Sequence, residues 1–203
     1  MADVTTLFWD VGGVILTNGW DRNSRKLASQ QFGLDWEEHQ DRHELSFPAF
    51  EMGELTLDQY LDRTVFYRSR SYSRDEFRAF MFAQSRELPD SRAVVSQLAR
   101  SGRYFLATIN NEPLELNQRR IEHFGLRNDF RAFFSSCYVG ARKPDAAIYR
   151  MALEVTQRAP QECIFIDDRP LNLECVGRLG MRTIHFQNAA QLEDELRRNG
   201  VAA

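Results

Sequence analysis

The sequence predicts an α/β fold in which helices pack on both faces of a doubly wound, mainly parallel sheet. Five short apolar segments of strand length recur along the chain, and helical patterns separate the last four of them. A long stretch without a strand pattern, residues 10–103, separates the first segment from the second. A loop of that length is unusual in a compact domain. We therefore expect an inserted all-helical region between the first two strands.

Most of the expected strands are continuous apolar runs, which are typical of strands that are buried on both faces of a parallel sheet. They are Thr5–Trp9, Tyr104–Ile109, Phe134–Val139, Cys163–Ile166 and Thr183–Phe186. Right-handed crossovers would place these strands side by side with their carboxyl ends at one edge of the sheet. Because ligands of such sheets bind at that edge, the residues that follow the strands are the candidates for a functional site.

Three helical segments alternate with the later strands, and each has a recognisable start or stop. Leu114–Phe124 ends at Gly125 and Asn172–Leu179 ends at Gly180, since glycine readily adopts the conformation that closes a helix. Asp145–Thr156 begins directly after a proline. This alternation of strands and helices favours the parallel sheet over an antiparallel one.

The stretch between the first two strands contains signals for helix starts. Thr56-Leu57-Asp58-Gln59 and Ser73-Arg74-Asp75-Glu76 both fit the capping box, and each precedes a helical pattern of apolar or aromatic residues. We therefore expect residues 19–88 to form a helical cap over the catalytic edge of the sheet. Residues 1–18 and 89–203 would then form the α/β core.

The composition narrows the class of protein. With 203 residues, 43% of them hydrophobic and 27% charged, the chain has the composition of a soluble globular protein. The net charge of −3 and the scattered basic residues indicate no nucleic-acid or membrane partner. The three cysteines lack metal-ligand spacing and favour a reducing, cytoplasmic location, as does the absence of a signal-peptide pattern. The sequence does not indicate the oligomeric state.

Several residues that carry chemistry follow the expected strands. Asp10 ends the first apolar run and precedes Val11-Gly12-Gly13-Val14, where the glycines let a ligand approach the backbone. A carboxylate at the end of a buried strand is unfavourable unless its charge is used. Thr108 ends the second run, Lys143 follows the third, and the pair Asp167-Asp168 follows the fourth. Their order along the chain predicts one site at the edge of the sheet.

Four motifs give the chain a resemblance to the haloacid dehalogenase superfamily of phosphohydrolases and phosphotransferases, over nearly its whole length. They are Phe8-Trp9-Asp10-Val11-Gly12-Gly13-Val14, Thr108-Ile109-Asn110-Asn111, Arg142-Lys143-Pro144-Asp145 and Ile166-Asp167-Asp168-Arg169-Pro170-Leu171-Asn172. The resemblance implies a Rossmann-like core with an inserted helical cap of the C1 type. The loop with two glycines is similar to that of a subgroup that includes sugar-phosphate phosphatases.

The resemblance also implies roles for these residues in the hydrolysis of a small phosphate ester. Asp10 would attack phosphorus and form an aspartyl-phosphate that water then hydrolyses. Asp10 and Asp168 would bind Mg²⁺ through carboxylate oxygens, together with the backbone carbonyl of Gly12. Asp167 is the alternative metal ligand, because it is adjacent and could share that role. Lys143 would stabilise the phosphate and Asp10.

Two positions that would contact the substrate are less well defined. Either Thr108 or Asn110 would donate a hydrogen bond to the phosphate, because the spacing here differs from that of the family. Trp20 lies where the cap and the core would meet, and it would either contact the substrate or pack at the hinge between them. His39 and His43 are one turn apart but have no third metal ligand, so packing or solvated side chains are expected.

Gly12 is the main departure from the family pattern. Phosphatases of the family commonly have an aspartate two residues after the nucleophile, which protonates the leaving group and activates water. Proton transfer of this kind supplies about 10²- to 10⁴-fold in rate. Glycine provides no such group. Two hypotheses therefore remain, a magnesium-dependent phosphatase that uses another proton carrier and a catalytically impaired protein that binds phosphate or regulates.

Overall fold

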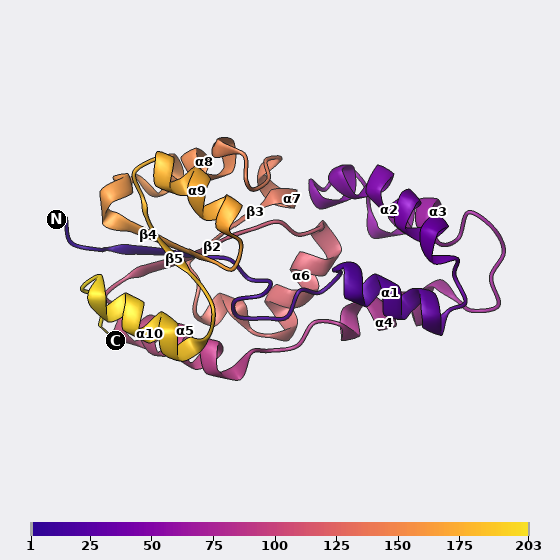
Figure 1. Cartoon of the computed structure of the whole chain (residues 1–203), viewed down its shortest axis with the longest axis horizontal. Coiled ribbons are helices and arrows are strands. Elements are labelled where there is room, and N and C mark those ends of the chain that lie inside the picture. The colour runs from indigo at the N-terminus through magenta and orange to yellow at the C-terminus, as the bar shows by residue number, and fades with distance from the viewer. Residues whose placement is uncertain (1, 203) are drawn as a thin grey trace.

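The computed structural model describes residues 2–202 and contains one parallel sheet with the strand order β3-β2-β1-β4-β5. The strands are β1 (Thr6–Trp9), β2 (Phe105–Asn110), β3 (Ala132–Ser135), β4 (Cys163–Asp167) and β5 (Arg182–His185). The chain order of the strands reverses at β1, which makes the sheet doubly wound. The predicted α/β fold class is confirmed (Figure 1).

The helices and two short 3-10 helices complete the fold. They are α1 (Arg22–Gln31), α2 (Trp36–Glu51), α3 (Leu57–Thr64), α4 (Arg74–Ala83), α5 (Pro89–Ser101), α6 (Leu114–His123), η1 (Leu126–Asn128), α7 (Ser136–Val139), α8 (Ala146–Thr156), η2 (Pro160–Glu162), α9 (Pro170–Arg178) and α10 (Ala189–Arg198). The three helices predicted between the later strands are α6, α8 and α9. Within residues 2–202, no helix has the length and hydropathy that crossing a membrane requires.

Helices cover both faces of the sheet, with α8 and α9 on one face and α5 and α10 on the other (Figure 1). Successive residues of β1 point to opposite faces, so Leu7 packs in the core beneath α5 and α10 while Phe8 packs beneath α8 and α9. This burial on both sides explains why the strands read as continuous apolar runs. It also holds the strand ends in fixed positions, from which the site residues project.

The third strand was predicted wrongly in its bounds. The sequence predicted Phe134–Val139, whereas β3 ends at Ser135 and the next four residues form α7. Ser135 Oγ donates to Asn110 Oδ1 over 2.9 Å, and Ser136 Oγ donates to the carbonyl oxygen of Glu51 over 2.6 Å. Short hydroxyl side chains that bond to nearby groups compete with strand hydrogen bonding, and here they end the strand.

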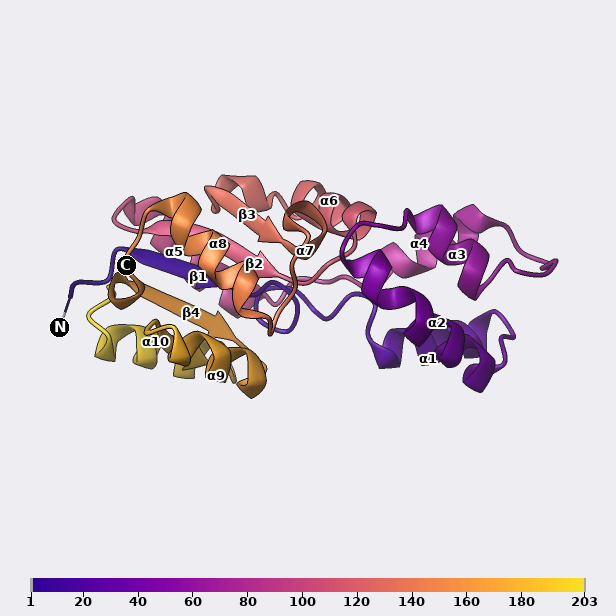
Figure 2. The same ribbon diagram turned by 90° about the horizontal axis from the view of Figure 1, so that it is seen from above.

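Between β1 and β2 every element is a helix, as predicted. α1–α4 lie beyond the carboxyl ends of the strands and form a separate part of the molecule (Figure 2). They share their own hydrophobic core, in which Phe50, Tyr60, Phe77 and Met81 are fully buried. Both predicted capping boxes are present at the N-termini of α3 and α4. We call α1–α4 the helical region.

The two segments that join the helical region to the sheet run side by side. Thr17 N donates to the Arg86 carbonyl oxygen over 2.8 Å, and Leu88 N donates to the Ile15 carbonyl oxygen over 3.0 Å. An isolated antiparallel bridge pairs Leu16 with Glu87 between these bonds. The helical region is thus connected to the core through one paired linker.

Candidate active site

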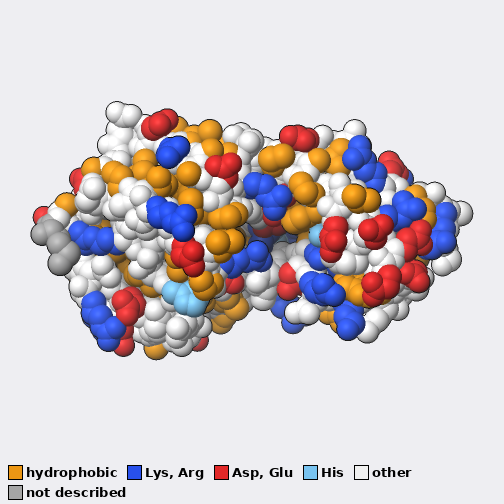
Figure 3. All heavy atoms as spheres, turned by 45° about the horizontal axis from the view of Figure 1, so that its top comes forward, with side chains coloured by type: hydrophobic (Ala, Val, Ile, Leu, Met, Phe, Trp, Pro, Cys, Tyr) orange, Lys and Arg blue, Asp and Glu red, His pale blue; other side chains and the backbone are white. Residues whose placement is uncertain are grey.

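A cavity of about 480 Å³ lies between the carboxyl edge of the sheet and the helical region. Its walls come from the loops after β1, β2 and β4, from the loop before α8, and from α1, α2, α6 and α9. The hollow between the two parts of the molecule is visible in Figure 3, where charged side chains border it. The charged residues in its walls come from both parts, so we describe the site first on the sheet side and then on the helical side.

Asp10 lies at the bottom of this cavity, directly after β1. Its side chain is 11% exposed, and its Oδ1 accepts a hydrogen bond from Val11 N over 2.7 Å. The same oxygen is 2.8 Å from Lys143 Nζ. Burial raises the pKa of Asp10 to about 7, although the nearby ammonium group of Lys143 lowers it. A cation near this carboxylate would therefore favour the ionised form that a nucleophile requires.

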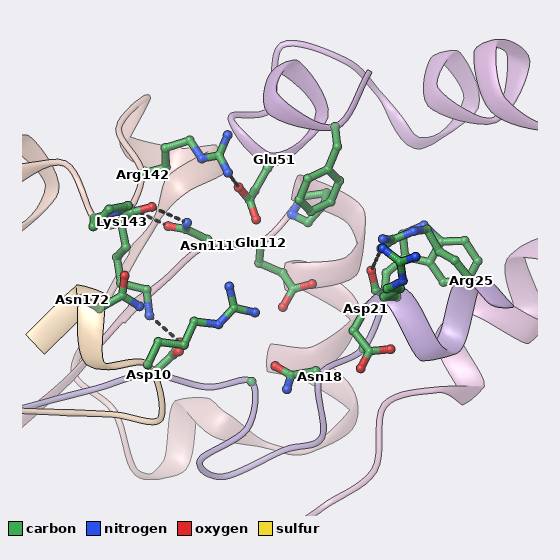
Figure 4. A pocket seen from close by; sticks show the side chains of 18 of the residues that line it. Asp10, Asn18, Asp21, Arg25, Glu51, Asn111, Glu112, Arg142, Lys143 and Asn172 are labelled. Carbon is green, nitrogen blue, oxygen red and sulfur yellow. Dashed lines mark hydrogen bonds and ion pairs between the residues drawn. The ribbon is translucent and has the colours of Figure 1, made fainter. Parts of the chain in front are cut away.

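Lys143 joins two carboxylates from neighbouring strands. Its Nζ is 2.8 Å from Asp10 Oδ1 and 2.7 Å from Asp167 Oδ2. Burial favours the neutral amine, but these two carboxylates raise the pKa of Lys143 above its usual value, so the side chain stays charged. The backbone of Lys143 is held by Asn111, whose amide group donates to its carbonyl oxygen and accepts from its N–H. Lys143 is therefore fixed as a positive charge beside Asp10 (Figure 4).

Asp167 is fully buried at the end of β4, and its oxygens are already occupied. Asn172 Nδ2 lies 3.0 Å from Oδ1 and 2.9 Å from Oδ2, and Arg169 N donates to Oδ1 over 2.8 Å. Together with Lys143, these donors satisfy the carboxylate. Asp167 thus anchors Lys143 and the start of α9.

Asp168 has the opposite character. Its Oδ1 is buried and has no hydrogen-bond partner among residues 2–202. Its Oδ2 lies so close to Gly13, which has a φ of +79°, that no Cβ atom would fit there. The glycine is therefore required both for the backbone conformation and for the close approach of the carboxylate.

The three aspartates fit a divalent cation. One oxygen from each of Asp10, Asp167 and Asp168 lies within 4.8 Å of the others. When ionised, these side chains carry three negative charges against the single positive charge of Lys143, which leaves two uncompensated. The free buried oxygen of Asp168 is a suitable ligand for a hard cation such as Mg²⁺.

The structure does not bring either predicted phosphate donor of β2 into the cavity. Thr108 is fully buried, and its hydroxyl donates to Asn110 Oδ1 over 3.4 Å. Asn110 is also buried, and its Nδ2 donates to Asn117 Oδ1 over 3.2 Å. The side chains that follow β2 and do line the cavity belong to Asn111 and Glu112. The sequence alone left Thr108 and Asn110 as alternatives, and neither side chain lines the cavity.

Gly12 and Trp20 both line the cavity. A Cβ atom on Gly12 would lie 2.9 Å from Asn18 Oδ1 and 3.8 Å from Arg120 Nη1, so these side chains take up the space beside the glycine. Trp20 Nε1 donates to Tyr60 Oη over 2.8 Å. The indole N–H is thus already bonded to a residue of the helical region.

Several charged residues that line the cavity were not predicted from the sequence. Arg120 forms an ion pair with Glu112, and Arg142 Nη2 is 2.7 Å from Glu51 Oε2. Arg25 reaches the cavity from α1. Glu112 carried a usable signal, since it closely follows a strand, as Asp10 does. The others lie in helices or loops, and only the tertiary fold brings them to the site.

His39 and His43 are both buried, as packing side chains would be. His39 Nδ1 is 2.9 Å from Ser29 Oγ, and His43 Nδ1 is 2.8 Å from Tyr60 Oη. Burial lowers the pKa of His39 to about 4 and that of His43 to about 3. Both belong to α2 of the helical region, where His43 also lines the cavity, and neither belongs to the group of three aspartates that could hold a metal ion.

The chain is similar in sequence to known hydrolases. Flavin mononucleotide hydrolase 1 of Arabidopsis thaliana is 28% identical over 160 residues, which are 79% of this chain and 64% of that protein. Phosphoserine phosphatase of Thermus thermophilus is 30% identical over 107 residues, which are 52% of this chain and 43% of that protein. The chain thus matches less than two thirds of the length of each of these relatives.

The fold is also found among solved structures. A HAD family enzyme of Bacteroides thetaiotaomicron, in complex with magnesium and inorganic phosphate, superposes with a TM-score of 0.74 at 18% sequence identity. The match covers 91% of this chain and 95% of that one. A family model for haloacid dehalogenase-like hydrolases matches residues 4–174, which is most of the chain. The chain therefore belongs to the haloacid dehalogenase-like hydrolases.

Proposed function

We propose that the protein is a magnesium-dependent phosphatase that hydrolyses a small phosphomonoester through an aspartyl-phosphate on Asp10. The observation that carries this proposal is the contact of Asp10 with Lys143 beside the carboxylates of Asp167 and Asp168, at one end of a cavity. The names of the relatives support the class of reaction, because one refers to hydrolysis of flavin mononucleotide and another to phosphoserine.

In this mechanism Asp10 attacks the phosphorus atom of the ester, and the alcohol leaves on the opposite side. Lys143 neutralises charge on the phosphoryl oxygens, because its Nζ already lies 2.8 Å from the nucleophilic carboxylate. Water then attacks the aspartyl-phosphate and restores the carboxylate of Asp10. Asp167 holds Lys143 in place during both steps.

Mg²⁺ would be held by Asp10 and Asp168, while Asp167 would remain paired with Lys143. When bound, it would reduce the repulsion between the phosphate and Asp10 and neutralise charge that develops on the phosphoryl group. The free oxygen of Asp168 supports this assignment over one in which Asp167 is the principal ligand.

The helical region, with residues 19–88 as its bounds, would serve as a cap over this site. Two contacts hold the end of α2 against the core: Ser136 Oγ donates to the carbonyl oxygen of Glu51, and Arg142 pairs with its carboxylate. Motion about the paired linker would open and close the cavity. The closed form would exclude water during the reaction.

Because Gly12 has no side chain, proton transfer to the leaving group requires another residue, and we assign it to Glu51. Glu51 lines the cavity from α2, and burial raises its pKa to about 7, although Arg142 lowers it. A carboxyl group with such a pKa can donate and accept a proton near neutral pH. Glu112 also lines the cavity, but its partner Arg120 is buried, whereas Arg142, the partner of Glu51, is partly exposed to solvent and therefore holds the negative charge less strongly.

The direct test is hydrolysis of a panel of phosphate esters with magnesium. We expect release of phosphate by the wild-type protein, loss of that activity on addition of EDTA, and loss in Asp10→Asn. Arg74→Gln is the matched control, because Arg74 lies on the surface of α4 and pairs with Asp62 rather than with a cavity residue. A wild-type protein that releases no phosphate from any ester would contradict the proposal.

The second candidate function, an impaired phosphate-binding protein, is favoured by Gly12 and by the side chains that fill the space beside it. The double variant Gly12→Asp with Asn18→Ala tests it, because removal of the Asn18 amide makes room for the new carboxylate. If the wild-type protein binds phosphate without turnover and the double variant gains activity, the impaired protein is the correct description. Turnover by the wild-type protein excludes it.

A further inference from the structure

Arg25 forms no ion pair with another described residue, although it is almost completely buried. Its relative exposure is 6%, and it lines the cavity from α1. Within residues 2–202, no carboxylate lies within 4.0 Å of its guanidinium nitrogens. A buried charge without a partner is strongly unfavourable, so its presence calls for an explanation.

The guanidinium group is fixed by neutral partners. Arg25 Nε donates to Gln40 Oε1 over 3.2 Å, and Nη1 donates to the carbonyl oxygen of Trp20 over 2.8 Å. Nη2 makes no hydrogen bond with the described part of the chain, yet it is not among the atoms that are sealed off from solvent. The group is therefore oriented in advance, with one nitrogen free for a ligand.

Burial lowers the pKa of Arg25, and the carboxylates of Asp21 and Glu44 offset this only in part, from beyond ion-pair distance. Glu44 accepts a hydrogen bond from Gln40 Nε2 over 2.9 Å, and Asp21 has another role. Its Oδ1 accepts hydrogen bonds from Ser24 N over 2.8 Å and from Ser24 Oγ over 2.6 Å, as the N-cap of α1. His43, which also faces the cavity, is neutral because burial and the charge of Arg25 lower its pKa to about 3. None of these residues neutralises Arg25.

Arg25 differs in this respect from the other buried cations of the cavity. Arg120 is paired with Glu112, and Lys143 is paired with Asp10 and Asp167. Figure 4 shows Arg25 on the side of the cavity away from Asp10 and Lys143. The cavity thus has a paired cationic site at the sheet and an unpaired one in the helical region.

We propose that Arg25 binds a second anionic group, a carboxylate or a second phosphate, on the leaving group of the substrate. This inference rests on the proposed phosphatase function and names its substrate class, phosphomonoesters whose alcohol part is itself an anion. The phosphoryl group would lie at Asp10 and Lys143, and the second anion would reach across the cavity to Arg25. The substrate would thereby supply the counter-ion that Arg25 lacks in the protein.

A matched pair of substrates tests this. 4-Carboxyphenyl phosphate and 4-carbamoylphenyl phosphate have nearly the same shape and differ in the charge of one group. We expect the wild-type protein to prefer the carboxylate ester in kcat/KM by on the order of 10- to 100-fold, the range for a hydrogen bond to a charged group. The preference should lie mainly in KM, because the contact is remote from phosphorus. 1,4-Phenylene bisphosphate, tested alongside, distinguishes a second phosphate from a carboxylate.

Two variants test whether Arg25 causes the preference for the anionic ester. Arg25→Gln should remove the preference for the anionic ester, so that the ratio of the two kcat/KM values approaches one. Lys26→Gln is the control, because Lys26 is exposed on the same helix and does not line the cavity, and it should keep the wild-type ratio.

Three outcomes can be told apart. Equal hydrolysis of the charged and neutral esters by the wild-type protein would overturn the inference and leave the phosphatase function standing, even if Arg25→Gln failed to fold. A preference that survives in Arg25→Gln would also overturn it. Failure to hydrolyse any ester of the panel would instead overturn the phosphatase function.

Discussion

Asp167 and Asp168 are adjacent in the chain but have different surroundings. Asp167 is bonded to Lys143, Asn172 and the backbone of Arg169, whereas Asp168 has a buried oxygen to which none of the described residues donates. The first arrangement stabilises the fold, and the second suits a ligand for a cation. The two aspartates should therefore respond differently to the same substitution.

We expect Asp168→Asn to weaken magnesium binding with little loss of stability. Burial and the charge of Asp167 raise the pKa of Asp168, so its ionised form is unfavourable without a cation. The magnesium concentration for half-maximal activity should rise by more than the roughly 10- to 100-fold that changes around metal ligands produce. Asp167→Asn should instead lower the free energy of unfolding by about 3 kcal/mol, because it breaks a buried ion pair.

Magnesium titration and urea unfolding of both variants measure these effects. The assignment is wrong if Asp167→Asn has the larger effect on magnesium and Asp168→Asn has the larger effect on stability.

The sequence predicted part of the site at this scale. The carboxylates at the ends of β1 and β4 were predictable because a polar residue that ends a buried run is conspicuous. The sequence alone did not indicate which aspartate has a free oxygen, since that depends on Asn172 and Gly13 in the folded protein. Thr108 and Asn110 were expected to donate to the phosphate, but the sequence does not show that Ser135 and Asn117 lie beside them in the fold. Asn110 is hydrogen-bonded to both, and Thr108 donates to Asn110, so the two side chains belong to a buried network.

At the scale of elements, the last residue of α2 places a carboxyl group in the wall of the cavity. Glu51 is only 6% exposed, and Arg142 from the loop before α8 pairs with it. Burial raises its pKa to about 7, so the protonated form that donates to a leaving group is present below pH 7 and disappears above it. The rate of leaving-group protonation should therefore fall as the pH rises through 7.

We expect Glu51→Gln to lower kcat by about 10²- to 10⁴-fold for esters of poorly acidic alcohols, and to remove the decline above pH 7. 4-Nitrophenyl phosphate should be much less affected, because its leaving group needs no proton. Arg142→Gln should shift the decline to higher pH, since Arg142 lowers the pKa of Glu51. Rate profiles for both substrates at saturating magnesium test this, and an equal loss for the two substrates would exclude Glu51 as the acid.

The element predictions succeeded where local signals were strong and failed where tertiary contacts decided the outcome. The capping boxes at Thr56 and Ser73 are local, and both helices begin where the sequence indicated. The end of β3 depends on contacts of Ser135 and Ser136 with residues distant in the chain, among them Asn110 and Glu51. The apolar residues that follow therefore read as strand although they form α7.

At the scale of the whole molecule, the cavity is shared between the sheet edge and the helical region. The sequence predicted that residues 19–88 would be helical and would lie near the strand ends, because the insertion closely follows the carboxyl end of the first strand. It did not indicate that Arg25 and Glu51 face the cavity. Their positions depend on how α1 and α2 dock onto the core, through the paired linker and the contacts of Ser136 and Arg142.

The central claim is that Asp10 accepts the phosphoryl group, and chemical trapping tests it most directly. The protein is quenched at a series of times during a single turnover, reduced with borohydride, and digested for peptide mass spectrometry. We predict that residue 10 becomes reduced to homoserine only when substrate and magnesium are present, since an acyl phosphate is reduced and a free carboxylate is not. Phosphate release at a normal rate with residue 10 unmodified at every time, or reduction at another residue, would contradict the account.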